Sequence, residues 1–531
     1  MPRMSPRALR RALALTLTVP AASLAVPAHA DDIPKAPGHR LVEQYAGAPA
    51  TAAPVPGPTP PQHPYLAANG RSGMHADAAG SGTYPWNGPL GKKPKVSSEK
   101  MAALGGECAT VTFDKAGRIV TVCGTFTGFL VKLLDPTSMQ TLAEYKLPQR
   151  PSTVEAITRL DFSKIFKDTS GGAYSYLDNE DRLVLADSRQ HIVRLAHEQA
   201  ADGSWRFVVD KDWDLTAQVP HDCVSWTNLY PSGECDPVTS VMPDWQGRIW
   251  WVTRQGRIGT VDPKSESGSG AIRSIRLDGE EIQNSFTVAE DGVSIVSDHA
   301  LYSFKAAADG TPEVQWRQTY DRGTGSKPGS VNQGSGTTPD LFGEHDEYVA
   351  ITDNADDRMN VLVYRRDPRV PDDKRLVCKV PVFGSGASTT DNSMISHGNS
   401  LVVENNYGYE NLTSLTFGRS VVGGVSRVDV RADGSGCDTV WESDVRSPST
   451  VPKLSTADGL VYLYTKEPNK LGIDAWYLTA VDFRTGEQKW KQLAGTGLAY
   501  DNNWAPVTLG PDGTAYVGVF NGLVAVRDGV S

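Results

Sequence analysis

Polar side chains stand at the start of several predicted strands. Thr390-Asp391-Asn392 and Asp501-Asn502-Asn503-Trp504 occupy equivalent positions in two repeats of the chain, and similar polar starts occur in two others. If the repeats form a ring, these oxygen-rich side chains converge on one point, which suits sugar hydroxyls or a hard cation. The alternative is that Asp and Asn only cap turns. The predicted ligand-binding residues are Asn284, Asp340, Asp391, Asn392, Asp501, Asn502, Asn503 and Trp504.

An acidic loop at residues 352–358 is the second candidate. Asp353, Asp356 and Asp357 supply enough oxygens for calcium, although their spacing is not that of an EF-hand. The alternative is a solvated acidic loop without an ion. Calcium is therefore the metal that these three residues predict.

Three histidines are the acid/base candidates of an enzyme hypothesis. His75, His221 and His397 lie beside polar or turn residues, and histidine titrates near neutral pH. Asn392, Asn503 and Trp504 would then position the substrate. The alternative for each histidine is a structural role, and His397, in a hairpin turn, would be a plain surface residue. The segment that holds His75 (residues 63–77) is expected to reach one face of the fold.

A repeated hairpin determines the predicted fold. Two alternating apolar runs flank Gly, Asp or Asn, which favour tight turns, and the unit returns about every fifty residues. We count eight copies, at residues 110–122, 176–185, 241–252, 286–296, 340–351, 394–403, 454–463 and 507–517. A second hairpin follows each first one, so each repeat is a four-stranded antiparallel sheet that must stack on its neighbours. The prediction is an all-β, eight-bladed β-propeller over residues 104–531, with seven blades as an alternative.

The last repeat ends one strand short, at residues 523–526. A strand from the segment before Cys108 is expected to complete this blade and close the ring, because closure removes exposed strand edges. Residues 31–103 are rich in Pro, Ala and Gly, and are predicted to be a linker followed by an extension on the main body.

One motif carries a resemblance to a known family. Ala480-Val481-Asp482, Thr485-Gly486 and Trp490 resemble the tryptophan-docking repeat of pyrroloquinoline-quinone (PQQ)-like propellers, related to quinoprotein alcohol dehydrogenases, and Trp316 and Trp441 fit it loosely. The resemblance implies blades that close up through a small residue and pack a tryptophan between them. It also raises a quinone-dependent dehydrogenase as a function. That enzyme class typically has a vicinal disulfide, and the chain has no adjacent cysteines, so bound PQQ is not expected.

The N-terminus predicts export. Residues 1–30 combine four arginines, an interrupted apolar run and Ala28-His29-Ala30, which fits a signal-peptide cleavage site. The predicted location is secreted or periplasmic, and no later run is long enough to span a membrane. The formal net charge of −10 becomes more negative without the leader, which argues against nucleic-acid partners.

Six cysteines, an even number in an exported chain, predict disulfides. The preferred set is Cys108–Cys123 within one hairpin, Cys223–Cys235 across a loop, and Cys378–Cys437 between outer strands of neighbouring blades.

The leading function hypothesis is therefore an exported propeller that binds a ligand or a protein partner at its axial funnel. The partner would be a polar small molecule, a carbohydrate or an envelope protein. The competing hypothesis is a secreted lyase or hydrolase that acts on a carbohydrate-like polar substrate. Fold alone does not decide between them.

Overall fold

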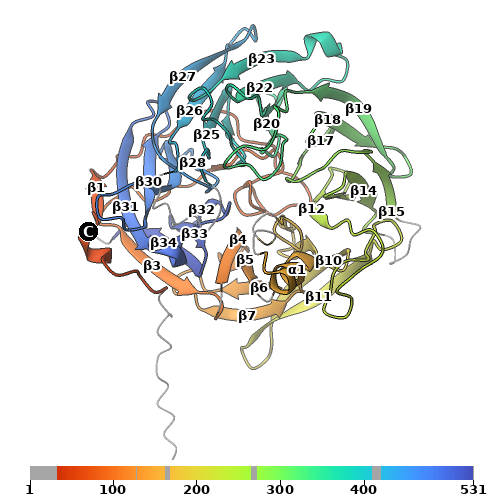
Figure 1. Cartoon of the computed structure of the whole chain (residues 1–531), viewed down its shortest axis with the longest axis horizontal. Coiled ribbons are helices and arrows are strands. Elements are labelled where there is room, and N and C mark those ends of the chain that lie inside the picture. The colour runs from red at the N-terminus through yellow and green to blue at the C-terminus, as the bar shows by residue number, and fades with distance from the viewer. Residues whose placement is uncertain are drawn as a thin grey trace, which may run out of the picture.

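Eight four-stranded blades surround a central axis in the computed structural model, which describes residues 33–529 except 104, 127, 162–164, 166, 167, 265–271 and 410–419. The predicted all-β, eight-bladed propeller is confirmed, and the seven-bladed alternative is wrong (Figure 1). The predicted leader lies outside the described residues. No helix within the described residues is long and apolar enough to cross a bilayer.

Within each blade the strands run antiparallel, from the axis outward. Blade 1 is β4 (Gly105–Phe113), β5 (Ile119–Thr125), β6 (Gly128–Leu134) and β7 (Thr141–Lys146). Blade 2 is β8 (Tyr176–Leu177), β9 (Leu183–Ala186), β10 (His191–Gln199) and β11 (Trp205–Asp214). Blade 3 is β12 (Val238–Pro243), β13 (Ile249–Thr253), β14 (Arg257–Val261) and β15 (Ile272–Arg276). Blade 4 is β16 (Thr287–Ala289), β17 (Gly292–Val296), β18 (Ala300–Ala306) and β19 (Pro312–Thr319).

The second half of the ring repeats this plan. Blade 5 is β20 (Asp340–Phe342), β21 (Tyr348–Thr352), β22 (Asn360–Arg365) and β23 (Leu376–Pro381). Blade 6 is β24 (Ile395–His397), β25 (Ser400–Glu404), β26 (Val425–Val430) and β27 (Cys437–Ser443). Blade 7 is β28 (Lys453–Ser455), β29 (Leu460–Lys466), β30 (Ala475–Asp482) and β31 (Gln488–Thr496). Blade 8 is β32 (Val507–Leu509), β33 (Ala515–Val519) and β34 (Gly522–Arg527), completed on the outside by β3 (Lys95–Lys100).

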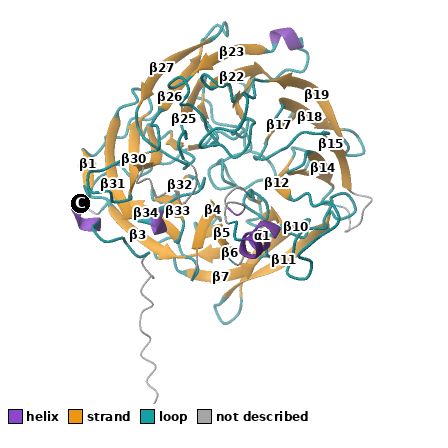
Figure 2. Ribbon diagram, viewed as in Figure 1, coloured by secondary structure: helices purple, strands orange, loops and turns teal. Residues whose placement is uncertain are grey.

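The expected closing strand is confirmed, since β3 pairs with β34 in antiparallel register. Two further strands of the N-terminal region extend blade 7: β1 (Tyr45–Gly47) pairs with β31 on the outside, and β2 (Thr83–Tyr84) pairs in parallel with β28 on the inside. The helices of the described residues are few and short: α1 (Pro151–Arg159), η1 (His39–Leu41), η3 (Asp372–Lys374) and η4 (Leu498–Tyr500) (Figure 2).

Aspartates shape the turns of the first hairpins. Asp114 accepts hydrogen bonds from the backbone N–H groups of Ala116 (2.9 Å) and Arg118 (2.8 Å). Asp178 and Asp244 make the same pair of bonds in blades 2 and 3. The side chain thus satisfies the turn's own donors, which explains why the recurring Asp predicted the hairpins correctly.

Tryptophans connect neighbouring blades. Trp316 of blade 4 donates through Nε1 to the carbonyl of Arg366 in blade 5 (3.0 Å), and Trp441 of blade 6 donates to that of Phe483 in blade 7 (2.9 Å). Trp441 also lies so close to Gly486 that a Cβ there would approach its ring to 2.6 Å. The turn glycine of the docking motif is therefore needed for the packing of one blade on the next.

The N-terminal segment closes one end of the central channel. Residues 66–86, here named the collar, run inside the ring and lie behind the plane of Figure 1. Backbone N–H groups of the innermost strands donate to collar carbonyls at 2.7–3.3 Å. The donor–acceptor pairs are Phe113 to Arg71, Leu177 to Ser72, Val288 to Ala78, Leu341 to Ala79, Ser396 to Ser81 and Leu454 to Gly82. Small residues permit this approach: a Cβ on Gly80 (φ +79°) would lie 2.7 Å from Cγ2 of Thr287.

The three predicted disulfides are confirmed. Cys378–Cys437 joins β23 to β27, the outermost strands of blades 5 and 6, and closes a chain separation of 59 residues. Three disulfides fit a non-reducing environment.

We expect the double substitution Cys378→Ala/Cys437→Ala to lower the free energy of unfolding by up to about 4 kcal/mol, because the unfolded chain regains the entropy of a long loop. The matched control is Cys223→Ala/Cys235→Ala, also partly exposed, whose separation of 12 residues gives a loss of about 3 kcal/mol. Urea unfolding monitored by circular dichroism measures both. A larger loss for the control pair would contradict a contribution from loop entropy between the blades.

Candidate functional site

A cavity of about 140 Å³ lies near the axis. The collar residues Met74 and His75 form one side of it. The segments that lead into the innermost strands of blades 6, 7 and 8 form part of its wall, β4 of blade 1 forms another part, and the collar contributes its floor. The polar residues that line it are His75, Glu107, Thr125, Arg150, Asp168, Thr169, Asp391, Asn392, Ser393 and Asn503. The aromatic residues that line it are Phe126, Phe129, Tyr174, Trp504 and Phe520.

Hydrogen bonds connect the wall residues across blades 6, 7, 8 and 1. Glu107 of β4 accepts from the backbone N–H of Asn503 (2.5 Å). The carbonyl of Asn502 accepts from Oγ of Ser449 (2.7 Å), and the carbonyl of Ser449 accepts from Nδ2 of Asn392 (2.9 Å). This continuous chain of bonds fixes Glu107 and Asn392 on one stretch of the cavity wall.

The amide of Asn392 has one defined orientation. Its Nδ2 donates both to the carbonyl of Ser449 and to Oε1 of Glu404. A carbonyl can only accept, so the amide nitrogen must face Ser449. The Oδ1 atom is then an acceptor, and it has no hydrogen-bond partner among the described residues. Asn392 is 1% exposed, so an unpaired acceptor there is costly unless something else donates to it.

Two carboxyls near the wall hold their protons unusually strongly. Burial raises the pKa of Glu107 to about 8, and the nearby Asp501 carboxylate raises it further. Burial also raises the pKa of Asp501 to about 8, with Lys466 opposing the shift. Lys466 is itself paired with Asp474 (2.7 Å). Both Glu107 and Asp501 are therefore largely protonated at neutral pH, as expected for carboxyls in a site of low dielectric.

Trp504 has a backbone conformation rare for a bulky residue, with φ +61°. Its ring lies edge to face with Tyr409 (5.5 Å between centroids), whose hydroxyl donates to the carbonyl of Asn502 (2.8 Å). The surrounding wall thus holds Trp504 at the cavity despite the strain, and such strain is common at binding sites.

The collar supplies His75 to the floor. Its Nε2 lies 3.2 Å from Oγ1 of Thr338, and its ring stacks on Tyr174 (6.1 Å between centroids). Burial holds the pKa of His75 well below its ordinary value, and Lys453 lowers it further, so the imidazole is neutral. A neutral imidazole can accept or donate a hydrogen bond, but it is poorly suited to carry a positive charge.

A buried charge cluster lies around Lys453, deeper in the channel. The side chain is fully buried, and Nζ has no hydrogen-bond partner among the described residues. Burial lowers the pKa of Lys453 to about 8, against the opposing effects of Asp340, Asp77 and Glu404. Burial raises the pKa of Asp77 to about 6 and that of Glu404 to about 7. The channel interior therefore carries more carboxyls than cations.

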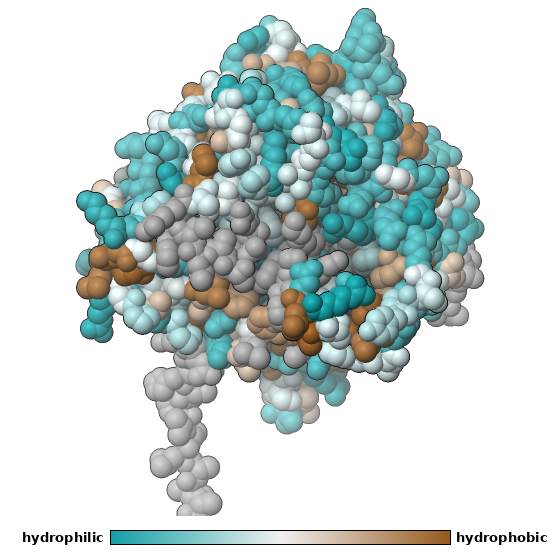
Figure 3. Space-filling view, viewed as in Figure 1, coloured by the Kyte–Doolittle hydropathy of each residue, from teal (hydrophilic) through white to brown (hydrophobic). Residues whose placement is uncertain are grey.

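The opposite wall is more apolar. Arg150 donates to the carbonyl of Asp168 (2.6 Å), and its guanidinium lies over Phe129 (4.3 Å). The carboxylate of Asp168 also forms an ion pair with this guanidinium, so Arg150 adds little net charge to the cavity. Figure 3 shows apolar side chains around α1 on this face, where Ile157 and Leu160 are exposed.

The predicted ligand-binding residues fall into two layers. Asp391, Asn392, Asn503 and Trp504 line the cavity, whereas Asn284, Asp340, Asp501 and Asn502 lie behind it, each at most 5% exposed. Ligand binding by them stays a prediction.

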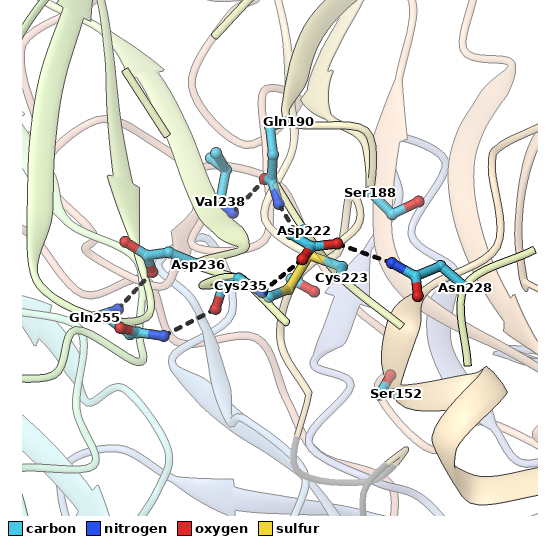
Figure 4. The surroundings of a disulfide bond; sticks show 12 residues. Ser152, Ser188, Gln190, Asp222, Cys223, Asn228, Cys235, Asp236, Val238 and Gln255 are labelled. Atoms are coloured by element: carbon cyan, nitrogen blue, oxygen red, sulfur yellow. Dashed lines mark hydrogen bonds between the residues drawn. A yellow bond between two sulfur atoms is a disulfide. The ribbon is translucent and has the colours of Figure 1, made fainter. Parts of the chain in front are cut away.

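His75 is the one predicted acid/base histidine at the cavity. His221 is exposed and lines an open recess beside the Cys223–Cys235 loop. Figure 4 shows that loop, in which Asn228 donates to Asp222 (2.8 Å) and Gln255 donates to the carbonyl of Cys235 (2.8 Å).

His397 does not lie at the cavity either. Its turn is covered by the N-terminal segment at Val55 and Pro56, and the residue is only 8% exposed, so the expectation of a surface histidine is corrected. The segment itself is what buries the ring, and sequence alone did not place it there.

The acidic loop does not gather around one point. Asp353 accepts from Asn360 (2.7 Å to its backbone N–H), Asp356 accepts from the backbone of Thr324, and Asp357 accepts from Ser385. Among the described residues no group of three or more His, Cys, Asp or Glu is arranged to hold a metal ion. We therefore propose no calcium site at these residues.

A quinone cofactor does not fit the cavity. PQQ is a tricarboxylate, and its recognition calls for uncompensated cations. The cavity instead presents Glu107, and Arg150 is already paired with Asp168.

Comparison with known proteins does not show a family for this chain. No family model matches the chain. A protein of Archaeoglobus fulgidus, described as uncharacterized, is 28% identical over 323 residues, and the match covers 55% of this chain and 61% of that protein. The chain thus spans less than two thirds of that relative.

Solved β-propellers are similar to the chain at low identity. Streptogramin B lyase has a TM-score of 0.33 and 8% identity over 82% of this chain and 97% of that one. The WD40 repeats of RRP9 have a TM-score of 0.39 and 9% identity over 77% and 99%. A protein from Lactobacillus plantarum has a TM-score of 0.38 and 12% identity over 70% and 92%. These likenesses carry no inference about ligand or activity.

Sequence reasoning missed Glu107, Tyr174 and Lys453. Glu107 stands at the start of β4, the innermost strand of blade 1, so the positional argument that found Asn392 and Asn503 applies to it as well. Lys453 begins β28 in the same way. Tyr174 carries no comparable signal.

We expect the free energy of unfolding to fall as pH rises from about 6 to about 8. Asp77, Glu404, Glu107 and Asp501 have native pKa values of about 6, 7, 8 and 8, above their ordinary values. The native state therefore keeps protons that the unfolded chain releases, so the stabilisation is complete below about pH 4 and is lost through the native pKa values. Lys453, with its pKa lowered to about 8, acts in the opposite direction only above pH 8.

Urea midpoints between pH 5 and pH 8 measure this dependence. Glu107→Gln should flatten the upper part of the curve, and Glu290→Gln, an exposed control, should leave it unchanged. A midpoint that increases between pH 6 and pH 8 would show that the carboxyls are not buried as described.

Proposed function

We propose that this protein is an exported propeller whose axial cavity binds a small polar ligand with an apolar or ring-shaped part. One observation carries the proposal: the cavity above the collar is lined by Asn392, whose buried Oδ1 has no partner among the described residues, and by Glu107. Concave sites with aromatic walls and few fixed polar groups are typical of small-molecule binding. The leader-like N-terminus and three disulfides support export.

The size of the cavity favours a small molecule over a protein partner. A space of about 140 Å³ is close to the size of an engineered cavity that binds benzene. The ligand would place a ring against Trp504 or Phe126 and donate hydrogen bonds to the polar wall. A carbohydrate-like molecule meets the second requirement through its hydroxyls.

A second candidate function is a lyase or hydrolase at the same cavity. The observation that favours it is Glu107, a carboxylic acid on the wall with a pKa of about 8. Such a group is protonated at neutral pH and can donate its proton to a leaving group, which is the role of a general acid. His75, neutral on the floor, can accept or donate a hydrogen bond to the substrate and so help to orient it.

We expect Ala109→Phe to abolish ligand binding, because Ala109 lines the cavity and the larger ring fills it. A panel of small polar ring compounds, including simple glycosides, would be screened by ligand-observed NMR with the mature protein. The matched control is Ala217→Phe in the open recess at His221. Hits that disappear in the control and persist in Ala109→Phe would move the site to that recess.

For the enzyme candidate, we expect Glu107→Gln to lower kcat on any hydrolysed or eliminated substrate by about 100-fold or more, with a small change in KM. Steady-state assays on glycosides and lactones between pH 6 and pH 9 measure this, and loss of activity above about pH 8 is expected as the acid ionises. Full activity of the Gln variant would rule out Glu107 as the acid.

A further inference from the structure

One acidic side chain at the cavity, Glu107, has no cationic partner among the described residues. Glu107 is partly exposed where it lines the cavity, and its one hydrogen bond comes from the backbone of Asn503 (2.5 Å). No ion pair joins it to a Lys, Arg or His of the described residues. Its carboxyl group is thus positioned by the wall, with no countercharge among the residues that the structure describes.

Asn392 is the second polar group of the cavity wall that a ligand would contact. Oδ1 of Asn392, 1% exposed and without a partner among the described residues, can only accept a hydrogen bond. The amide cannot turn over to present its nitrogen instead, because Nδ2 faces the carbonyl of Ser449 (2.9 Å). A ligand at this wall must therefore bring N–H or O–H donors.

Aromatic rings surround these two anchors. Trp504, Tyr174 and Phe126 line the cavity, and rings of this kind attract organic cations as well as apolar groups. Arg150, whose guanidinium lies at the cavity, is paired with the carboxylate of Asp168 and does not repel a cation strongly.

We propose that the ligand of the axial cavity is a small organic ammonium compound, whose N–H groups donate to Glu107 and Asn392 and whose apolar part packs on the aromatic wall. This inference rests on the proposed function of the cavity and names its ligand class. A primary ammonium offers three donors and a positive charge, so it satisfies both anchors together. A neutral alcohol supplies a donor but offers no positive charge to the carboxylate form of Glu107.

We expect binding of an ammonium ligand to be coupled to the release of a proton from Glu107. In the free protein Glu107 is protonated below about pH 8, and an ammonium ligand requires the carboxylate. Binding therefore releases a proton below pH 8, and affinity rises with pH until Glu107 is ionised in the free protein as well.

Other titratable groups face this region from every packed element. They are Asp501, Lys466 and Asp474 from blades 7 and 8, Asp391 and Tyr409 from blade 6, Arg150 and Asp168 beside α1, and His75 from the collar. Lys466 and Asp474 are paired, as are Arg150 and Asp168, and His75 is neutral. Two groups can contribute a second step: Glu404, which accepts a hydrogen bond from Asn392 and whose pKa burial raises to about 7, and Asp501, whose pKa burial raises to about 8.

The test is calorimetric titration of the mature protein with benzylamine and with benzyl alcohol, its neutral counterpart, at pH 6.5, 7.5 and 8.5. We expect benzylammonium to bind about tenfold or more tightly than the alcohol at pH 8.5, with affinity rising up to about tenfold from pH 6.5 to 7.5 and with about one proton released at pH 6.5. Glu107→Gln should remove the pH dependence and the preference for the amine, and Glu290→Gln should keep both.

The variant remains informative because Gln has the shape of Glu and removes a buried ionisable group, so it should fold at least as well at pH 8. Equal or tighter binding of benzyl alcohol, affinity for the amine that falls with pH, an amine preference kept by Glu107→Gln, or no binding of benzylamine at millimolar concentration would overturn the inference. If benzyl alcohol alone binds and Ala109→Phe abolishes that binding, the proposed cavity function stands and only the ligand class falls.

Discussion

The backbone hydrogen bonds between the collar and the innermost strands are the constraint on which the site depends. A propeller channel is ordinarily open at both ends, and its innermost strands leave N–H groups facing the axis. Here residues 66–86 accept such hydrogen bonds from blades 1, 2, 4, 5, 6 and 7, and the run Ala78-Ala79-Gly80-Ser81-Gly82 keeps the approach close enough. The channel thereby becomes a cavity with a floor, and His75 reaches the floor because the collar carries it there.

Closure of the channel also explains the unusual charges. Once the collar is in place, Lys453, Asp77 and Asp340 are cut off from water, and each pays the desolvation cost of a charged group. Lys453 offsets part of that cost for the carboxyls around it, but Glu107, on the wall above, has no such partner within the part of the chain that the structure describes. The fold thus keeps Glu107, whose charged form is costly to bury, at a place where a ligand can supply the missing positive charge.

Much of the fold could be predicted from sequence because it is local. A turn aspartate such as Asp114 satisfies donors two and four residues away, so the hairpins are visible in the chain itself. The missing last strand and the Cys378–Cys437 bridge followed from counting strands and blades. The path of the collar did not follow, since a run of Ala, Gly and Ser has the composition of a linker whether it lies in solvent or in a channel.

The site was predictable only in outline. Asn392, Asn503 and Trp504 were found because each stands in a run of polar or aromatic residues before an inner strand, whereas Glu107 stands alone beside glycines. His397 and Asp353 were candidates by residue type, but the N-terminal segment covers the first and Asn360 binds the second. Long-range contacts of this kind carry no local signal in a single sequence.

The most direct test of the account is a high-resolution crystal structure of the mature protein grown with benzylamine. We expect residues 66–86 to lie inside the ring and the ligand nitrogen to lie within hydrogen-bonding distance of both Glu107 and Oδ1 of Asn392. A collar outside the channel, or benzylamine bound elsewhere while the axial cavity holds only water, would contradict it.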